Sequence, residues 1–177
     1  MTFGRNCLAG VAPAAVVLVA WSSAAFAQSA GGCQAEVLQD PPRTVLTCPN
    51  GVKITAEEGT NFNLLDRAAA AGPEAATLDG NALLLEAPAG AVEGGFEVVT
   101  PQAIAAVRGT KWAVDVAGDT TSVFVVDGRV AVSRRAGERG VALGPGEGVD
   151  VDAGTAPLTV RRWGAARVAA LLARFGE

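Results

Sequence analysis

The chain has 177 residues, of which 50% are hydrophobic, with 14 Lys and Arg against 18 Asp and Glu and a net charge of −4 at pH 7. This length and apolar content predict a single domain with its own buried core. An acidic balance excludes the concentrated basic face that nucleic-acid binding needs. The chain also lacks histidine and tyrosine, which excludes Ser-His and Cys-His nucleophilic catalysis, so we expect no enzyme activity.

Residues 1–27 have the layout of an export signal. Arg5 supplies a short positive end, an apolar stretch runs from Leu8 to Trp21, and Ala25-Phe26-Ala27 forms a small-x-small cleavage site. Cleavage there would leave a chain that starts at Gln28 and is located in the periplasm. The alternative is an uncleaved membrane anchor, because an apolar span of about 20 residues can cross a bilayer.

Two cysteines follow the predicted signal, Cys33 and Cys48. An even number of cysteines in an exported chain predicts a disulfide bond, and this one would close a loop of about 15 residues. Two free buried thiols are the alternative. A metal site is not expected, because two thiolates without histidine make only half of a zinc shell. We expect no cofactor.

Short β-strands are predicted in the first half of the exported chain. The runs are rich in β-branched or apolar residues and are separated by turn residues: Glu36–Leu38, Thr44–Thr47, Val52–Thr55, Asn61–Asp66, Ala76–Leu78 and Ala82–Glu86. We interpret the last two as a hairpin joined at Asp79-Gly80-Asn81. Pro88–Gly95, with three glycines, is predicted to be a flexible loop.

The second half contains denser strand signals: Phe96–Thr100, Ile104–Val107, Lys111–Ala117, Thr121–Val126, Arg129–Arg134 and Val141–Leu143. In the third of these runs Trp112, Val114 and Val116 alternate with more polar positions, so they share one face. Asp127-Gly128 predicts a two-residue hairpin turn, since glycine adopts positive φ readily. Regular turn spacing predicts an all-β fold, a β-sandwich or β-roll of short antiparallel strands.

Arg108-Gly109-Thr110 interrupts the apolar centre of the sequence. One interpretation is a strand break, in which Gly109 lets the chain bend and Arg108 points to solvent. The other is an arginine held at a rigid joint to meet the carboxylate of a partner.

The C-terminal segment changes to a helical period. One face collects apolar residues, namely Val160, Gly164, Val168, Leu171, Leu172 and Phe175. Pro157 precedes this stretch and Gly176 follows it, as helix start and stop signals do. Trp163 and Arg167 are four residues apart and are expected to stack. We expect this amphipathic helix to pack on the β domain rather than on a membrane.

The motifs of the dense region resemble those of the FecR domain family. Thr100-Pro101 and Val107-Arg108-Gly109-Thr110 carry most of the resemblance, which covers about residues 82–151. The resemblance implies a periplasmic all-β module without catalytic residues. In the best-known members this module relays the state of an outer-membrane siderophore receptor to a cytoplasmic sigma factor. Only a few residues precede the apolar stretch here, so the cytoplasmic sigma-binding segment of those members is not expected.

These observations predict three parts: a signal peptide at 1–27, a FecR-like all-β domain at 28–156 with its core motif at 82–151, and a helix within 157–177. The expected function is a non-enzymatic binding or signalling module of the cell envelope. Its partner would be an envelope protein or a glycan, and only an uncleaved signal would touch the membrane. The alternative is a membrane-anchored sensor component that modulates an anti-sigma and sigma-factor system for siderophore or metal uptake.

Overall fold

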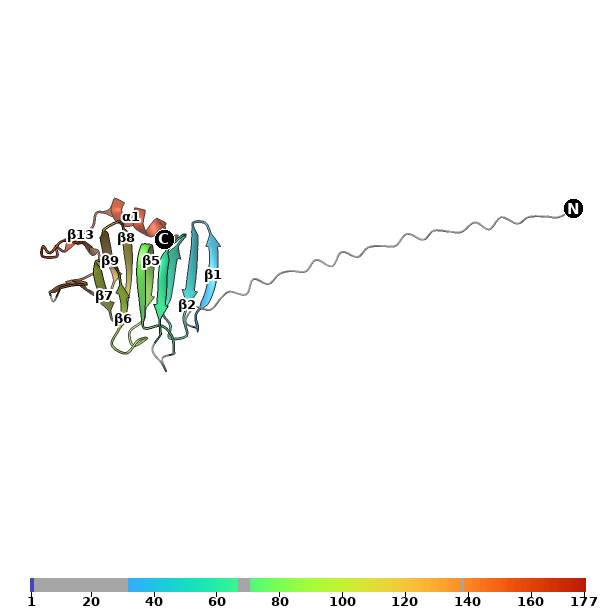
Figure 1. The fold of residues 1–177 in the computed structure, drawn as a ribbon, viewed down its shortest axis with the longest axis horizontal. Coiled ribbons are helices and arrows are strands. Elements are labelled where there is room, and N and C mark those ends of the chain that lie inside the picture. Colours follow the sequence, from blue (N-terminus) through green and yellow to red (C-terminus); the bar gives the residue numbers. More distant parts are fainter. Residues whose placement is uncertain (2–31, 67–70, 138) are drawn as a thin grey trace.

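The computed structural model describes residues 1, 32–66, 71–137 and 139–177 (Figure 1). The predicted signal segment, whether cleaved or retained as an anchor, therefore lies outside the described residues apart from Met1. Within the described ranges, no helix is both long enough and apolar enough to cross a membrane.

The described residues form short strands and one C-terminal helix, so the all-β prediction is confirmed. The elements are β1 (Gln34–Gln39), β2 (Pro42–Thr47), β3 (Lys53–Glu57), β4 (Asn61–Leu65), β5 (Ala75–Ala87), β6 (Phe96–Val99), β7 (Ala103–Val107), β8 (Thr110–Ala117), β9 (Thr120–Asp127), β10 (Val130–Arg134), β11 (Gly140–Leu143), β12 (Glu147–Val151), β13 (Arg161–Arg162) and α1 (Ala165–Ala173).

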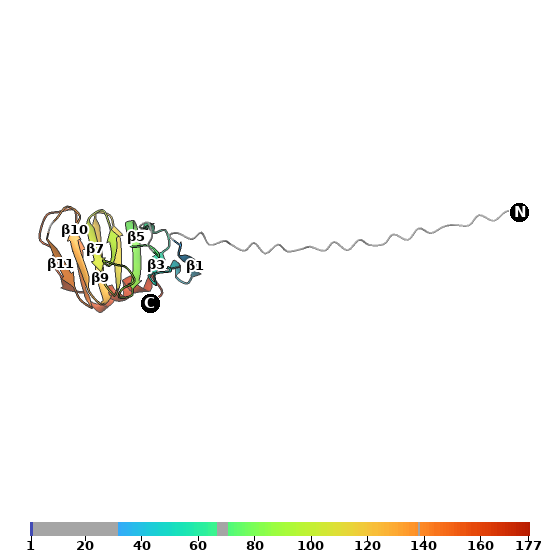
Figure 2. The same cartoon turned by 90° about the horizontal axis from the view of Figure 1, so that it is seen from below.

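The strands form one curled sheet whose two layers share β5. The larger sheet has the order β1-β2-β3-β5-β8-β9-β12-β13, and the smaller sheet has the order β4-β5-β6-β7-β10-β11. Figure 2 shows β11, β10 and β7 of the smaller sheet side by side. The strand pairings are antiparallel except that of β5 with β6, which is parallel. The architecture is therefore a roll in which the chain passes repeatedly between the layers.

A single long strand replaces the hairpin predicted at Asp79-Gly80-Asn81, so that prediction is wrong. Residues Ala75–Ala87 form one strand of 13 residues. Its first part pairs with β4 and β6 in the smaller sheet, and its second part pairs with β3 and β8 in the larger sheet. Asn81 has a φ of 63°, which asparagine tolerates better than most residues. The polar tripeptide thus marks a crossing between layers and not a reversal.

The predicted hairpin at Asp127-Gly128 is also wrong. Gly128 does have positive φ, at 86°, but β9 pairs with β8 and β12 whereas β10 pairs with β7 and β11. The turn carries the chain from the larger sheet to the smaller one. We call such a connection between the layers an arch.

A second arch, at Arg108-Gly109, lies beside the first. It connects β7 of the smaller sheet to β8 of the larger sheet. Val107 is opposite Val130 in the smaller sheet, and the Thr110 hydroxyl donates a 3.0 Å hydrogen bond to the Arg129 carbonyl. Each strand therefore pairs with a strand of the other arch instead of folding back on its own neighbour.

Gly128 tests the close contact between these arches. A Cβ at this position would lie 2.5 Å from the Gly109 carbonyl oxygen, whereas a Cβ at Gly90, whose φ is also positive, would meet nothing within 4 Å. We expect Gly128→Ala to lower the free energy of unfolding by about 2 kcal/mol and Gly90→Ala, the matched control, by about 1 kcal/mol, the general cost of left-handed backbone. Urea unfolding measures both, and equal losses would argue against arch packing as the cause.

The main core lies between the two layers. Its largest side chain is Trp112 of β8, which is fully buried and contacts Phe96 of β6 with ring centroids 6.2 Å apart. Val114 and Val116 point into the same core, in agreement with the predicted alternation along this strand. Burial of this apolar surface is the main stabilising contribution to the roll.

Helix α1 covers the outer face of the larger sheet (Figure 1). Leu171 and Phe175 are buried against a second apolar cluster from the sheet: Ala82, Leu84, Ala113 and Phe124. The helix begins at Ala165, later than the period suggested, because Arg161 and Arg162 form β13 beside β12. Val160 consequently packs against the main core and not on the helical face.

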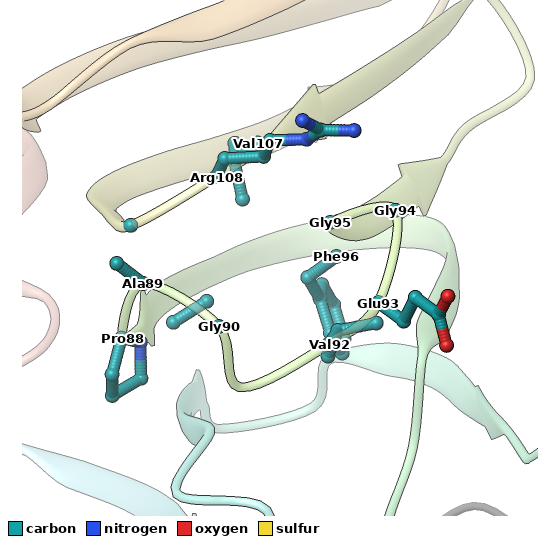
Figure 3. A pocket seen from close by; sticks show the side chains of 12 residues that line it. Pro88, Ala89, Gly90, Val92, Glu93, Gly94, Gly95, Phe96, Val107 and Arg108 are labelled. Carbon is teal, nitrogen blue, oxygen red and sulfur yellow. The ribbon is translucent and has the colours of Figure 1, made fainter.

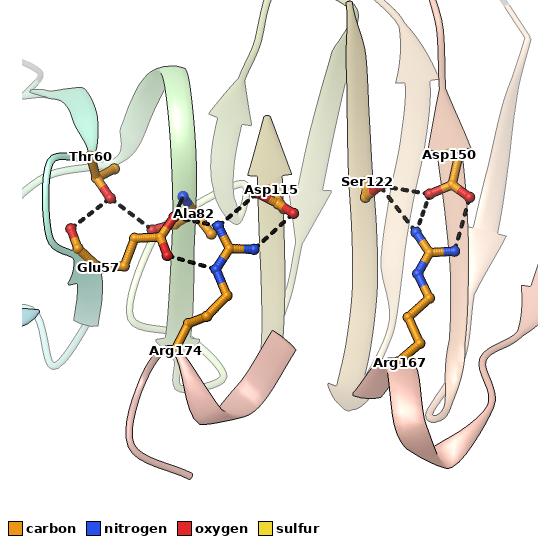
Figure 4. Close-up of polar contacts among 8 residues, drawn as sticks. All are labelled: Glu57, Thr60, Ala82, Asp115, Ser122, Asp150, Arg167 and Arg174. Atoms are coloured by element: carbon orange, nitrogen blue, oxygen red, sulfur yellow. Dashed lines mark hydrogen bonds and ion pairs between the residues drawn. The ribbon is translucent and has the colours of Figure 1, made fainter. Parts of the chain in front are cut away.

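Two arginines fasten α1 to the sheet (Figure 4). Arg174 donates hydrogen bonds to Glu57 of β3, at 2.6 Å from its Nε, and to Asp115 of β8, at 2.9 Å. Its hydrogen bonds with Glu57 outweigh partial burial and raise the pKa of Arg174 above its usual range. Arg167 binds Asp150 of β12 at 3.0 Å and lies 3.4 Å above the ring centre of Trp163, so the stacking predicted for this pair is present.

Asp150 predicts a defined pH dependence of stability. Its pKa is lowered by the hydrogen bond from Arg167, with Ser122 adding a second donor, although partial burial opposes the shift. A lowered folded-state pKa means that the carboxylate stabilises the fold above about pH 4, the ordinary value, and that this contribution is lost as the pH falls through the folded pKa.

We therefore expect Asp150→Asn to be less stable than the wild type at pH 7, by less than about 1 kcal/mol because the pair is solvent-screened. The difference should shrink below about pH 4. Urea midpoints at pH 7 and pH 3 measure this, and a constant difference across that range would contradict the assignment.

The predicted disulfide is present. Cys33 and Cys48 are bonded and both are buried in the main core. The bond ties the residue before β1 to the residue after β2, at the end of the hairpin opposite to its turn. The bond therefore holds this end of the β1–β2 hairpin, at the edge of the larger sheet, against the main core.

Candidate functional site

The structure separates the motif residues into two groups. Strand β7 lies between them, so Thr100-Pro101 is at one of its ends and Arg108-Gly109-Thr110 is at the other. Asp127-Gly128 lies with the second group, because its arch packs against that of Gly109. The motif is therefore not one continuous surface.

Thr100 is a structural residue that links the two layers. It is buried, and its hydroxyl accepts a 2.9 Å hydrogen bond from the Ala103 amide and lies 2.8 Å from the hydroxyl of Thr121 in the larger sheet. Thr121 in turn donates to the amide oxygen of Gln102 at 2.8 Å. Because Thr121 uses its proton there, the contact between the two hydroxyls uses the proton of Thr100, which also lies within 3.1 Å of the Ala103 carbonyl oxygen. The chain of donors satisfies both buried hydroxyls, which is what burial of polar groups requires.

The second group borders a cavity of about 430 Å³ (Figure 3). One wall is the loop between β5 and β6, from Pro88 to Phe96, and the other wall is Val107-Arg108-Gly109. Thr110 is buried behind this wall and holds the arch through its hydrogen bond to Arg129. The sequence predicted this loop to be flexible and did not predict that it faces the arginine.

Glycines make the close approach of the two walls possible. Gly95 has a φ of 99°, and a Cβ there would lie 2.1 Å from the Val107 carbonyl oxygen and 3.2 Å from Cγ of Arg108. Gly109 has a φ of 66°, and a Cβ there would lie 3.0 Å from Cβ of Ala89. Only glycine can occupy position 95 without a shift of the backbone. The sequence shows three glycines in this loop but not which of them packs against the opposite wall.

Two arginines on this side of the roll make no polar contact with another described side chain. Arg108 is exposed, and so is Arg129 on the neighbouring arch. Neither guanidinium makes a hydrogen bond or an ion pair with another described residue. A guanidinium presents several donors in a planar fork that matches a carboxylate. The arrangement can therefore bind an anionic group beside a small cavity.

The cavity does not have the composition of a catalytic centre. Its lining combines apolar side chains and glycines with Arg108 and Glu93, and it contains no nucleophile paired with a base. Among the residues that the structure describes, no group of three or more His, Cys, Asp or Glu could hold a metal ion.

The comparisons with known proteins agree with the motif analysis. The FecR family, described as FecR protein, matches residues 39–131. Two crystal structures of candidate anti-sigma factors from Parabacteroides distasonis ATCC 8503, at 2.50 and 1.65 Å resolution, have a similar fold, with TM-scores of 0.59 and 0.56 and 19% sequence identity each.

The alignments cover 79% and 81% of this chain but only 64% and 62% of those two proteins. The chain thus spans less than two thirds of each. No curated protein matches the sequence. The family match extends over more than half of the chain and includes β2 to β9 and both arches. This chain belongs to the FecR protein family.

Proposed function

We propose that the protein is a non-enzymatic FecR-domain module of the periplasm that binds another envelope component in a signalling pathway linked to a sigma factor. The observation that carries this proposal is the family match over residues 39–131. The description of the two similar structures as candidate anti-sigma factors supports the link to sigma-factor regulation. The apolar stretch and cleavage site of residues 1–27 support export.

The Arg108 cavity is the proposed contact with the partner. The exposed guanidinium of Arg108 binds a carboxylate of the partner, and the adjoining cavity accepts an apolar side chain of the partner next to that carboxylate. The arch holds the arginine backbone in place through the positive φ of Gly109 and the hydrogen bond of Thr110. The partner is an envelope protein, with an envelope glycan as the other candidate.

Cross-linking in intact cells tests this proposal. We expect an envelope protein to be captured by the wild type and by Arg139→Ala, and to be captured about tenfold less by Arg108→Ala, since loss of one charge-assisted contact weakens binding by about 1.5 to 3 kcal/mol. Arg139 is an exposed arginine beside β11, at the opposite end of β10 from Arg129, so its variant loses the same charge elsewhere. Equal capture by both variants would remove Arg108 from the contact, and no capture by the wild type would contradict the function.

A membrane-anchored sensor component is the second candidate function, favoured by the apolar stretch from Leu8 to Trp21. Intact mass measurement of the protein from cells separates the two. A mass that corresponds to residues 28–177 supports the exported module, and a mass that includes residues 1–27 supports the anchored sensor.

A further inference from the structure

We propose that the free edge of β4 is a docking site for an extended segment of a partner protein, with apolar residues at alternate positions and a basic residue at its end. This inference rests on the proposed function, because it identifies the chemical class of the binding partner. It concerns the edge of β4, whose acidic end shares Glu93 with the Arg108 cavity.

Strand β4 has an unpaired side. It pairs with β5 and with no other strand of the described residues, so it ends the smaller sheet. Its five residues, Asn61–Leu65, include no lysine and no proline, the residues that commonly prevent pairing at a sheet edge. The backbone groups along this side therefore accept a further strand.

Apolar side chains are exposed on both sides of this edge. Apart from Met1, the large apolar side chains that are exposed among the described residues are Val37, at 66%, and Leu65, at 46%. Val37 is on the same face of β1 as the buried Cys33. There the larger sheet continues past β3 through β2 and β1, whereas the smaller sheet ends at β4. Leu65 is the last residue of β4 itself.

A groove connects Val37 with β4. It has a volume of about 240 Å³, and Thr44, Ala56 and the half-buried Phe62 contribute to its lining. In the strand register Val37 is opposite Thr44, and Thr44 is opposite Ala56, so these residues form one row across the larger sheet. A strand added beside β4 would place alternate side chains over this row. A strand added to the outer edge of β1 would leave the row uncovered.

The charge at the end of β4 selects the partner. Asp66, Glu93 and Glu97 line a second cavity of about 350 Å³ beside Leu65, and no basic side chain of the described residues contributes to it. These three carboxylates make no ion pair with a described residue. A lysine or arginine of the partner strand would complement them. A second copy of this chain paired antiparallel through β4 would instead place Asn61 beside this acidic end, and Asn61 carries no positive charge to complement the carboxylates.

A synthetic peptide provides the probe. The acetylated and amidated heptapeptide Lys-Val-Thr-Val-Thr-Val-Lys has the required alternation and terminal charge. We expect its addition to slow amide hydrogen exchange at Asn61–Leu65 and to leave the exchange rates in β11 and β1 unchanged. NMR on ¹⁵N-labelled protein, in the form that is isolated from cells, measures these rates. Replacement of its lysines by glutamate, or of its central valine by proline, should weaken binding by at least about tenfold.

Two pairs of surface variants locate the contact. Val37→Ser with Leu65→Ser removes the apolar contacts, and Asp66→Asn with Glu93→Gln removes the charges; each pair should raise the Kd for the peptide by about tenfold. Ala142→Ser, at an exposed position of the opposite edge strand β11, is the matched control and should have no effect.

Slowed exchange at β1 or β11 in place of β4, or an unchanged Kd in both variant pairs, would overturn the proposal. Slowed exchange at β4 without peptide, increasing with protein concentration, would overturn it in favour of a second copy. Failure here is distinguishable from failure of the proposed function. If cross-linking in cells captures a partner equally well with the Val37 and Leu65 substitutions, only the proposed β4 site is wrong. If the peptide binds β4 but cross-linking captures no partner, only the proposed function is wrong.

Discussion

Replacing Trp112 by alanine is expected to lower the free energy of unfolding by about 4 kcal/mol, the largest effect that we predict for a single substitution. The indole is fully buried between the layers and contacts Phe96 of the opposite layer. Its Nε1 makes no hydrogen bond with a described residue. The loss therefore comes from apolar contact and from the cavity that the missing ring leaves, with no contribution from a broken hydrogen bond.

Trp163→Ala is the matched control for this prediction. Trp163 is half-buried on the outer side of the larger sheet, stacked on Phe124 at a centroid distance of 5.0 Å. Since solvent can fill part of the space, we expect a loss of about 2 kcal/mol. Urea unfolding followed by far-UV circular dichroism measures both variants without relying on tryptophan fluorescence. A loss for Trp112→Ala no larger than that for Trp163→Ala would show that the two layers are not held together by this core.

Removal of the disulfide is expected to lower the free energy of unfolding by about 3 kcal/mol, the loop-entropy value for a closed loop of about 15 residues. The change to make is Cys33→Ala with Cys48→Ala, because both positions are buried and serine would place hydroxyls in the core. In this model the cross-link acts mainly on the unfolded chain. Equilibrium urea unfolding of the double variant and of the oxidised wild type measures the difference.

Reduction of the wild type supplies the control for the disulfide. We expect dithiothreitol to lower the wild-type unfolding midpoint to near that of the double variant and to leave the double variant unchanged. A midpoint for the wild type that does not respond to reduction would indicate that Cys33 and Cys48 are not bonded in the purified protein.

The two proposed binding surfaces share one loop. Glu93, Gly94 and Gly95 line both the Arg108 cavity and the acidic cavity at the end of β4. A partner strand that ends with its basic residue beside Glu93 would thus lie close to the guanidinium of Arg108. The prediction is that substitutions at the β4 edge and at Arg108 show coupled effects on capture of the same partner, which a double-mutant cycle measures.

The local sequence pattern was sufficient to predict where the strands lie, but not which strands pair with each other. The alternation of Trp112, Val114 and Val116 predicted their shared face, and turn residues placed most strand ends near their observed positions. Asp127-Gly128 and Asp79-Gly80-Asn81 were wrongly predicted as hairpins, because a residue with positive φ permits a change of direction without selecting the neighbour that the next strand joins. That choice depended on β7, β10, β3 and β8, which are distant in sequence.

The candidate site likewise could be predicted only in part from the sequence. The motif around Arg108 was visible in the sequence, as was the cysteine pair, since both depend on residue type and spacing. The cavity beside Arg108 was not, because its second wall is a loop whose position is set by the close contact of Gly95 with Val107. The exposed Val37 and Leu65 were likewise hidden, since a strand that alternates in sequence gives no sign of whether another layer covers it.

The all-β class, the C-terminal amphipathic helix, the cysteine pair and the family resemblance could be predicted from the sequence alone, because each depends on local period, composition or a short motif. The folded structure was needed to show that the turns are arches between two layers, that Arg174 and Arg167 hold α1 on the sheet, and that β4 has a free edge. These features arise from contacts between residues far apart in the chain, and such contacts form only when the layers pack around their common core.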